Sequence, residues 1–204
     1  MTRWIFVRHG ESTANAQRFL SGWHDVPLTQ RGMDQAVAAA HQIQDEPIAA
    51  AVSSDLDRAR HTGELLLETW ATINDRQPPT LSLHPELRER RLGKAQGMPI
   101  DQVREMGLMK HLLGWDTRPS GGESHLDLAL RALPFLIRTS RETTGPVLVA
   151  SHGGMIRTII GLVDRRPTQK IGEWKIPNAT PIVRQVPTER WEELLQDISS
   201  PEGV

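Results

Sequence analysis

Two histidines and two arginines stand where strand patterns give way to helix or turn patterns. His9 follows Arg8 directly after the apolar run 4–7 in "RHGES", and His152 follows the run 147–151 in "SHGG". Arg58 lies in "SSDLDRAR", where a third strand pattern enters a helix. Guanidinium groups donate paired hydrogen bonds to phosphate oxygens, and neighbouring positive charge favours a neutral, nucleophilic histidine. These residue types predict a phosphate pocket with a histidine nucleophile.

The order of the elements explains how residues so far apart in the sequence can meet. Strand patterns lie at 4–7, 48–54, 80–84, 147–151 and 181–186, and helical patterns lie at 28–44, 56–73, 124–140 and 154–163. Such alternation predicts an α/β fold with a mostly parallel central sheet, in which ligands bind at the carboxyl ends of the strands. Each junction alone is equally compatible with an ordinary surface turn. The coincidence of three junctions favours a site.

Composition narrows the classes of partner. The 204 residues predict a single domain, 1–204, with the segment at about 92–122 as its least regular part. Lys and Arg number 24 and Asp and Glu 25, so bulk charge favours neither nucleic acid nor a membrane as partner. The chain has no cysteine, which excludes disulfides, a cysteine nucleophile and thiolate metal sites. The sequence shows no secretion-signal pattern and no long apolar run, which predicts a cytoplasmic location.

Several segments together resemble one known family. "RHGES" with Asn15, "SSDLDRARHT" and "SHGG" resemble the signature of the histidine phosphatase superfamily, which includes the cofactor-dependent phosphoglycerate mutases. The segment "SGWHDVPLTQRG" at 21–32 is also similar to that family. The resemblance covers nearly the whole chain in the right order. It implies a three-layer α/β/α sandwich of the phosphoglycerate mutase type.

The resemblance also implies roles for the residues that match. His9 attacks phosphorus and becomes phosphohistidine. The phosphoryl oxygens are held by a set of four residues, which comprises Arg8, Asn15, Arg58 and His152.

A carboxylate then protonates the leaving oxygen and later activates water. In "LHPELRERRLG", Glu89 takes the family position of this acid, and Glu86 is the alternative. The leaving group is expected to contact the 17–24 loop, in particular Ser21, Gly22 and Trp23, and the 92–122 segment. No metal ion or other cofactor is expected.

Three activities remain open within this resemblance. "SGGES" at 120–124 and a short segment before His152 favour a phosphatase acting on a small phosphorylated metabolite. Ala95 and Gln96 stand closer to the mutase pattern, and a mutase needs further cations for the substrate carboxylate. The candidates for that role are Arg18, Arg90, Arg91 and Lys94. A catalytically inactive binding protein is disfavoured because the nucleophile and both arginines are present. The oligomeric state, including a homodimer, is left open.

Overall fold

A five-stranded sheet forms the centre of the molecule, which was analysed as a computed structural model that describes residues 1–200. The strand order is β3-β2-β4-β1-β5, and the first four strands run parallel while β5 runs antiparallel to β1. This confirms the predicted α/β class with a mostly parallel sheet. The strands are β1 (Thr2–Arg8), β2 (Ala50–Ser53), β3 (Leu81–Leu83), β4 (Val147–Ser151) and β5 (Ile182–Val186).

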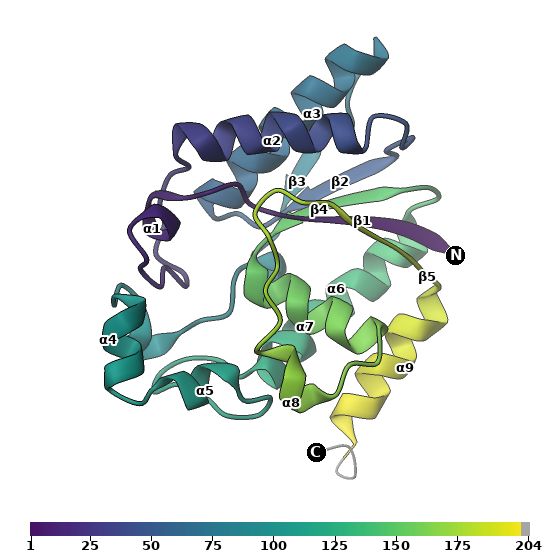
Figure 1. The fold of residues 1–204 in the computed structure, drawn as a ribbon. Coiled ribbons are helices and arrows are strands. Elements are labelled where there is room, and N and C mark those ends of the chain that lie inside the picture. The colour runs from purple at the N-terminus through teal and green to yellow at the C-terminus, as the bar shows by residue number, and fades with distance from the viewer. Residues whose placement is uncertain (201–204) are drawn as a thin grey trace.

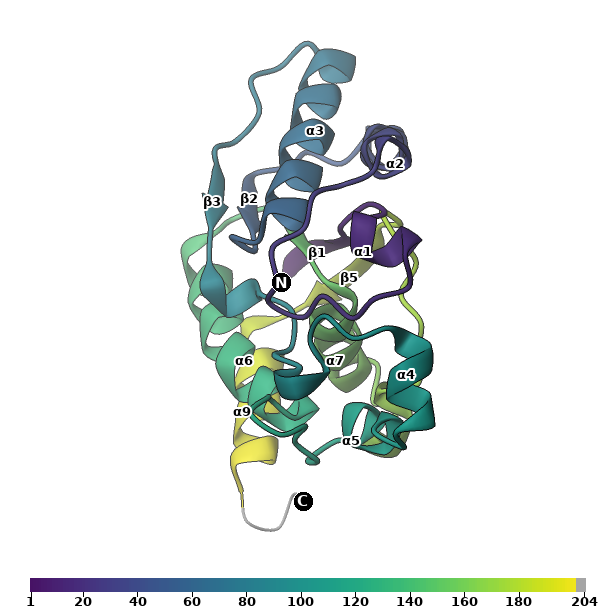
Figure 2. The ribbon, with the colours of Figure 1, turned by 90° about the vertical axis from the view of Figure 1, so that its left-hand side faces the viewer.

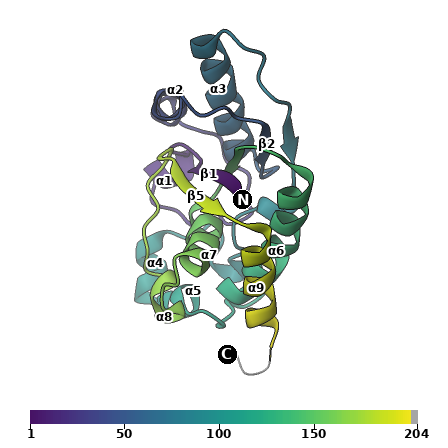
Figure 3. The same cartoon turned by 90° about the vertical axis from the view of Figure 1, so that its right-hand side faces the viewer.

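Helices cover both faces of this sheet, which gives three layers (Figure 1). Helices α2 and α3 lie on one face, and α6, α7 and α9 lie on the other. Figure 3 shows α9 alongside α6, next to the edge strand β5. The longer helices are α2 (Gln30–Gln42), α3 (Asp57–Asn74), α6 (His125–Glu142), α7 (Gly153–Val163) and α9 (Thr188–Ser199).

The alternation of side chains along β1 builds both cores. Trp4 and Phe6 enter the cluster under α6, α7 and α9, whereas Ile5 and Val7 enter the cluster under α2 and α3. All four are fully buried. Successive side chains of a strand point to opposite faces, so a strand covered on both sides must be apolar throughout. The continuous run "WIFV" reflects this position in the sheet.

Shorter helices surround the carboxyl edge of the sheet. They are α1 (Thr13–Ala16), α4 (Ile100–Glu105), α5 (Met109–Leu113) and α8 (Thr168–Ile171), together with the 3₁₀ turns η1 (Pro85–Leu87) and η2 (Gly93–Ala95). Segment 92–122, expected to be the least regular, therefore contains α4 and α5. Both lie at the side to which β1 points, as Figure 2 shows. A further sequence-based expectation, that the chain after α9 is frayed, falls largely on residues outside those that the structure describes.

Candidate active site

The three junctions meet at one edge of the sheet. In the sheet register Arg8 pairs with Ser151, and Ser53 pairs with Ala150, so β1, β4 and β2 end within one residue of each other. His9 continues the ladder through its backbone N–H, which donates to the carbonyl of Ser151 at 2.8 Å. The parallel order of neighbouring strands thus delivers the candidate residues to one place.

His9 is held in one tautomer. Its Nδ1 lies 2.7 Å from the carbonyl oxygen of Gly10, which can only accept, so Nδ1 carries the proton. Nε2 then presents its lone pair, and the Nε–H of Arg58 donates to it at 3.3 Å. Burial, and next the charges of Arg58 and Arg8, hold the pKa of His9 well below its usual value. A neutral imidazole with a free lone pair at Nε2 is the nucleophilic form.

Gly10 is required by close packing. Its φ is not positive, so the need for glycine comes from the space around it and not from the backbone conformation. A Cβ at this position would lie 2.1 Å from the carbonyl oxygen of Gly32 in α2. Any side chain here would therefore push α2 away from the loop that carries His9.

Arg58 is fully buried in the first turn of α3, where a cation is disfavoured by the helix dipole. Its guanidinium donates to the carbonyl oxygens of Gly22 at 2.7 Å and His24 at 3.1 Å. Desolvation lowers the pKa of Arg58, while the carboxylates of Glu89 and Asp25 act in the opposite direction. The 21–24 loop thus stabilises and orients this arginine beside His9.

His152 lies opposite His9, with the two ring centroids 5.3 Å apart. Its Nε2 lies 2.8 Å from the hydroxyl of Ser54, and Nδ1 has no hydrogen-bond partner among residues 1–200. Burial, and next Arg58, hold the pKa of His152 well below the usual value. A neutral ring with one nitrogen free is available to bind a ligand.

Arg8 and Arg157 converge over the start of α7. A Cβ at Gly153 would lie 3.3 Å from Nη2 of Arg157 and 3.4 Å from Nε of Arg8. Arg8 donates to the carbonyl of Ile176 at 2.7 Å, and burial lowers its pKa to about 10. Arg157, which the sequence analysis did not single out, donates to the carbonyls of Gly153 and Gly172. Arg157 stands one helical turn after Gly153 in "SHGGMIR". Residues four apart lie on the same helix face, so this spacing could have indicated that Arg157 lies near the site.

Glu89 lies at the N-terminus of α7. Its Oε2 accepts a hydrogen bond of 3.1 Å from the backbone N–H of Gly154, and its Oε1 accepts one of 2.8 Å from the backbone N–H of Arg90. A carboxylate is stabilised by the positive end of a helix. Glu86 lies elsewhere, 3.8 Å from Arg138 of α6. Of the two candidates, only Glu89 is placed beside the histidine pair and its arginines.

The side chain of Asn178 links the backbone of His9 to the side chain of Asn15. The side-chain amide of Asn178 donates to the carbonyl of His9 at 2.8 Å and to Oδ1 of Asn15 at 3.2 Å. Oδ1 of Asn15 also closes the capping box of α1 with Ser12. The amide NH₂ is therefore the group through which Asn15 can donate to a ligand. Asn178 is supplied by the chain before β5, which no local pattern around His9 could indicate.

The predicted leaving-group residues lie around the Glu89 segment. The indole N–H of Trp23 donates to the carbonyl of Glu89 at 2.6 Å, and its backbone N–H donates to Gln96 at 3.1 Å. The guanidinium carbon of Arg88 lies 4.9 Å from the centre of the Trp23 ring. Gly22 contributes its carbonyl to Arg58, and Ser21 its carbonyl to the N–H of His24. In this structure these residues position Arg58 and Glu89.

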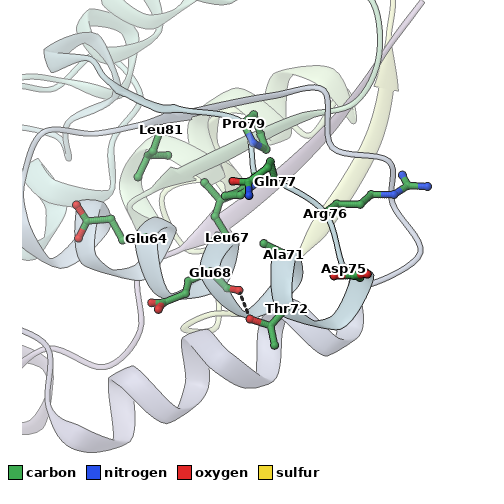
Figure 4. Close-up of a pocket in the computed structure, with 11 residues that line it drawn as sticks. Glu64, Leu67, Glu68, Ala71, Thr72, Asp75, Arg76, Gln77, Pro79 and Leu81 are labelled. Carbon is green, nitrogen blue, oxygen red and sulfur yellow. Dashed lines mark hydrogen bonds between the residues drawn. The ribbon is translucent and has the colours of Figure 1, made fainter.

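A cavity of about 150 Å³ opens next to Glu89. Its lining includes Arg90, His125, Gly154 and Arg157 on the polar side, and Leu20, Leu92, Met109, Leu112 and Leu113 on the apolar side. Another hollow, of about 590 Å³, lies between the second half of α3 and residues 75–81 (Figure 4). Its described lining includes neither Glu89 nor a junction residue, whereas the smaller cavity is lined by the acid candidate Glu89 and by Gly154 in the first turn of α7.

Comparison with known proteins agrees with this geometry. The family description "Histidine phosphatase superfamily (branch 1)" matches residues 4–197. The chain belongs to the histidine phosphatase superfamily. Within residues 1–200, no helix is long and apolar enough to cross a membrane, and no group of three or more His, Asp or Glu is placed to hold a metal ion.

Relatives of this superfamily member carry two kinds of name. A 2,3-bisphosphoglycerate-dependent phosphoglycerate mutase of Methylorubrum extorquens (strain PA1) is 33% identical over 189 residues, covering 88% of this chain and 87% of the relative. A mycobacterial glucosyl-3-phosphoglycerate phosphatase, solved with VO3, has a TM-score of 0.79 at 27% identity, covering 89% of this chain and 91% of the other. Bacillus stearothermophilus YhfR has a TM-score of 0.80 at 25% identity, covering 91% and 92% respectively. The superfamily membership supports an enzyme, and the names divide between mutase and phosphatase.

Proposed function

We propose that this protein is a metal-independent phosphomonoester hydrolase that acts on a small phosphorylated metabolite through a phosphohistidine intermediate. The observation that carries the proposal is the state of His9, whose Nδ1 is fixed on the Gly10 carbonyl and whose Nε2 faces Arg58 at 3.3 Å. A phosphoryl group would enter between these two side chains. The arginine would then donate to a phosphoryl oxygen in place of the imidazole.

In the first step, the Nε2 lone pair of His9 forms a bond to phosphorus while the bond from phosphorus to the ester oxygen breaks. Arg8, Arg58 and Asn15 donate hydrogen bonds to the phosphoryl oxygens and stabilise the developing charge. Glu89 enters this step as the protonated acid, gives its proton to the leaving oxygen, which departs as an alcohol, and ends the step as a carboxylate.

His152 completes the phosphoryl site. If the Ser54 hydroxyl donates to Nε2 of His152, the imidazole proton stands on Nδ1, the nitrogen without a partner among the described residues. The Ser54 oxygen accepts in turn from the backbone N–H of Leu56 at 3.2 Å. In this tautomer His152 is a neutral donor to a phosphoryl oxygen.

In the second step, water attacks phosphorus and gives its proton to Glu89. The bond between phosphorus and Nε2 breaks, which releases inorganic phosphate and restores neutral His9. The guanidiniums and the N-terminus of α7 supply the positive charge that a metal ion would otherwise provide.

The test is phosphate release from 4-nitrophenyl phosphate in the presence of a chelator, with the native chain and His9→Ala. We expect turnover with chelator that is lost in the variant, and phosphorus-31 NMR of acid-sensitive phosphohistidine on His9. Turnover that persists in His9→Ala would contradict the mechanism. Loss of turnover on chelation, restored by a divalent cation, would contradict metal independence.

A phosphoglycerate mutase is the second candidate, and Ala95, Gln96 and the names of the curated relatives favour it. Two of the four candidate cations for a substrate carboxylate are already engaged by other groups, which argues against it. Arg18 pairs with Asp101 at 3.0 Å, and buried Arg90 donates to the carbonyls of Leu112 and Glu123. Isomerisation of phosphoglycerate primed with its bisphosphate, faster than release of phosphate, would favour the mutase.

A further inference from the structure

His125 is a buried histidine beside the proposed acid that the proposed chemistry does not use. It is the first residue of α6, is 1% exposed, and lines the 150 Å³ cavity together with Glu89 and Arg157. Its Nε2 has no hydrogen-bond partner among residues 1–200. A buried polar atom without a partner is costly, so its presence in a cavity wall needs an explanation.

The hydrogen bonds of Thr158 define the tautomer of His125. The hydroxyl of Thr158 lies 2.7 Å from the carbonyl of Gly154, one helical turn earlier, and 2.7 Å from Nδ1 of His125. A hydroxyl has one hydrogen, and the carbonyl can only accept, so Thr158 donates to Gly154. Nδ1 of His125 therefore donates to Thr158, and Nε2 carries a lone pair.

The surroundings keep this ring neutral. Burial, followed by the charges of Arg90 and Arg157, lowers the pKa of His125 to about 2. The carbonyl of Leu112, which also accepts a hydrogen bond from Arg90, acts in the other direction. The ring also stands at the N-terminus of α6, where a cation is disfavoured. With its proton on Nδ1, His125 presents Nε2 as a neutral hydrogen-bond acceptor in a cavity whose other polar side chains are the carboxylate of Glu89 and the guanidiniums of Arg90 and Arg157.

We propose that His125 is a specificity-determining residue whose Nε2 accepts a hydrogen bond from a free hydroxyl of the leaving group. This inference rests on the proposed phosphomonoesterase activity and names its substrate class, a phosphate ester of a small alcohol that keeps a further hydroxyl. Glu89 at the same cavity wall would face the ester oxygen.

The dimensions of the cavity indicate the size of alcohol that it would surround. The cavity is partly open to solvent, and its space of about 150 Å³ matches about six non-hydrogen atoms, the size of benzene. The apolar wall of Leu20, Leu92 and Met109 fits a carbon chain, while His125 stands on the polar side. A three- or four-carbon polyol fits both the volume and the acceptor.

Two esters that differ in the hydroxyls test this assignment. Glycerol 1-phosphate and propyl phosphate have the same carbon chain, and propyl phosphate lacks the free hydroxyls. We expect native kcat/KM to favour glycerol 1-phosphate by about fivefold to tenfold, the effect of one hydrogen bond made only by that ester. His125→Phe should bring the ratio close to one, and His125→Gln, which retains an acceptor, should keep much of it.

His111→Phe is the matched control, because His111 lies on α5 and lines a different cavity beside Met106 and Lys94. It should leave the ratio of the two esters unchanged. Thermal unfolding of each variant establishes that the fold is retained, and nitrogen-15 NMR of His125 should show the proton on Nδ1. A proton on Nε2, or a native ratio near one, would overturn the inference.

Binding separates this inference from the proposed function. The affinity of His9→Ala for the two esters is measured by calorimetry, with and without His125→Phe. If the native chain releases phosphate from none of the esters, 4-nitrophenyl phosphate included, while His9→Ala still prefers glycerol 1-phosphate through His125, the hydrolase proposal fails and the assignment of His125 holds. Equal affinities for both esters would overturn the assignment even if hydrolysis is found. Binding of neither ester would overturn the assignment of His125, while the hydrolase proposal is decided separately by release of phosphate from 4-nitrophenyl phosphate.

Discussion

At the scale of single residues, the site depends on histidines kept neutral beside fixed positive charge. His9 and His152 are buried against Arg58, and both pKa values lie well below the usual value. A guanidinium stays charged under the same burial because its ordinary pKa is so high. The pocket therefore places the Nε2 lone pair of neutral His9 and a neutral His152 beside permanent cations, which is the combination that phosphoryl transfer to histidine requires.

The assignment of the acid is tested by the leaving group. Glu89→Gln should lower kcat/KM for propyl phosphate by about 100-fold, because an alkoxide must be protonated as it departs. The loss for 4-nitrophenyl phosphate should be several-fold smaller, since nitrophenolate departs without a proton. Both rates are measured as release of phosphate.

Glu86→Gln is the control for this comparison, because Glu86 lies beside Arg138. It should leave both esters within about twofold of the native rate. Equal losses for the two esters in Glu89→Gln would show that Glu89 maintains the structure or positions the phosphate and does not donate a proton to the leaving group.

At the scale of elements, the first turn of α7 organises the acid. The backbone N–H of Gly154 donates to Glu89, and a Cβ at Gly154 would lie 2.1 Å from Oε1 of that carboxylate. The helix can therefore carry Glu89 at its N-terminus only because this position has no side chain. The 21–24 loop acts in the same way on Arg58, through carbonyls rather than side chains.

Gly154→Ala should displace the carboxylate and lower kcat/KM for propyl phosphate by about tenfold to 100-fold. Alanine is favourable within a helix, so the melting temperature should change little. The double variant Gly154→Ala with Glu89→Gln identifies the cause. If the alanine acts through Glu89, the double variant is no slower than Glu89→Gln alone. Losses that multiply would place the effect elsewhere in the turn.

The sequence predicted the junctions because each is a local pattern. In "RHGES", "SSDLDRAR" and "SHGG" a histidine or arginine stands close to the end of an apolar strand and the start of a helix. Parallel pairing of the strands then brings these side chains to one edge of the sheet. Asn178 and the cavity residue His125 reach the site from distant loops and helix starts, which periodicity does not reveal. No sequence pattern around His125 indicates a role, because that role depends on a lone pair that only the contact with Thr158 defines.

At the scale of the whole molecule, the sheet separates two cores and presents the site at its edge. Trp4 packs edge-on against Trp191 of α9, with ring centroids 5.6 Å apart, far along β1 from His9. The predicted fold class followed from alternating strands and helices. The two helices within segment 92–122, α4 and α5, could not be predicted in this way. They have only 6 and 5 residues, and their apolar faces are too short to show a helical period.

Buried neutral histidines also link the stability of the whole fold to pH. The pKa of His125 is about 2 in the folded protein, against about 6.5 when unfolded. Below pH 6.5 the unfolded chain therefore binds a proton that the folded chain does not, and the free energy of unfolding falls as the pH falls. One such group contributes about 1.4 kcal/mol per pH unit, so between pH 6 and pH 5 we expect His125→Phe to lose less stability than the native chain by about that amount.

Urea unfolding at each pH measures this difference directly. Leu128→Ala is the matched control, since Leu128 is fully buried in the same helix and carries no proton. It should lower stability by about 2–5 kcal/mol at every pH, which leaves its curve parallel to the native one. His125→Phe should instead approach the native curve at neutral pH and rise relative to it in acid. Parallel curves for His125→Phe would mean that the imidazole of His125 gains its proton without unfolding of the protein. The assignment of His125 as a neutral acceptor in the cavity would then be wrong as well.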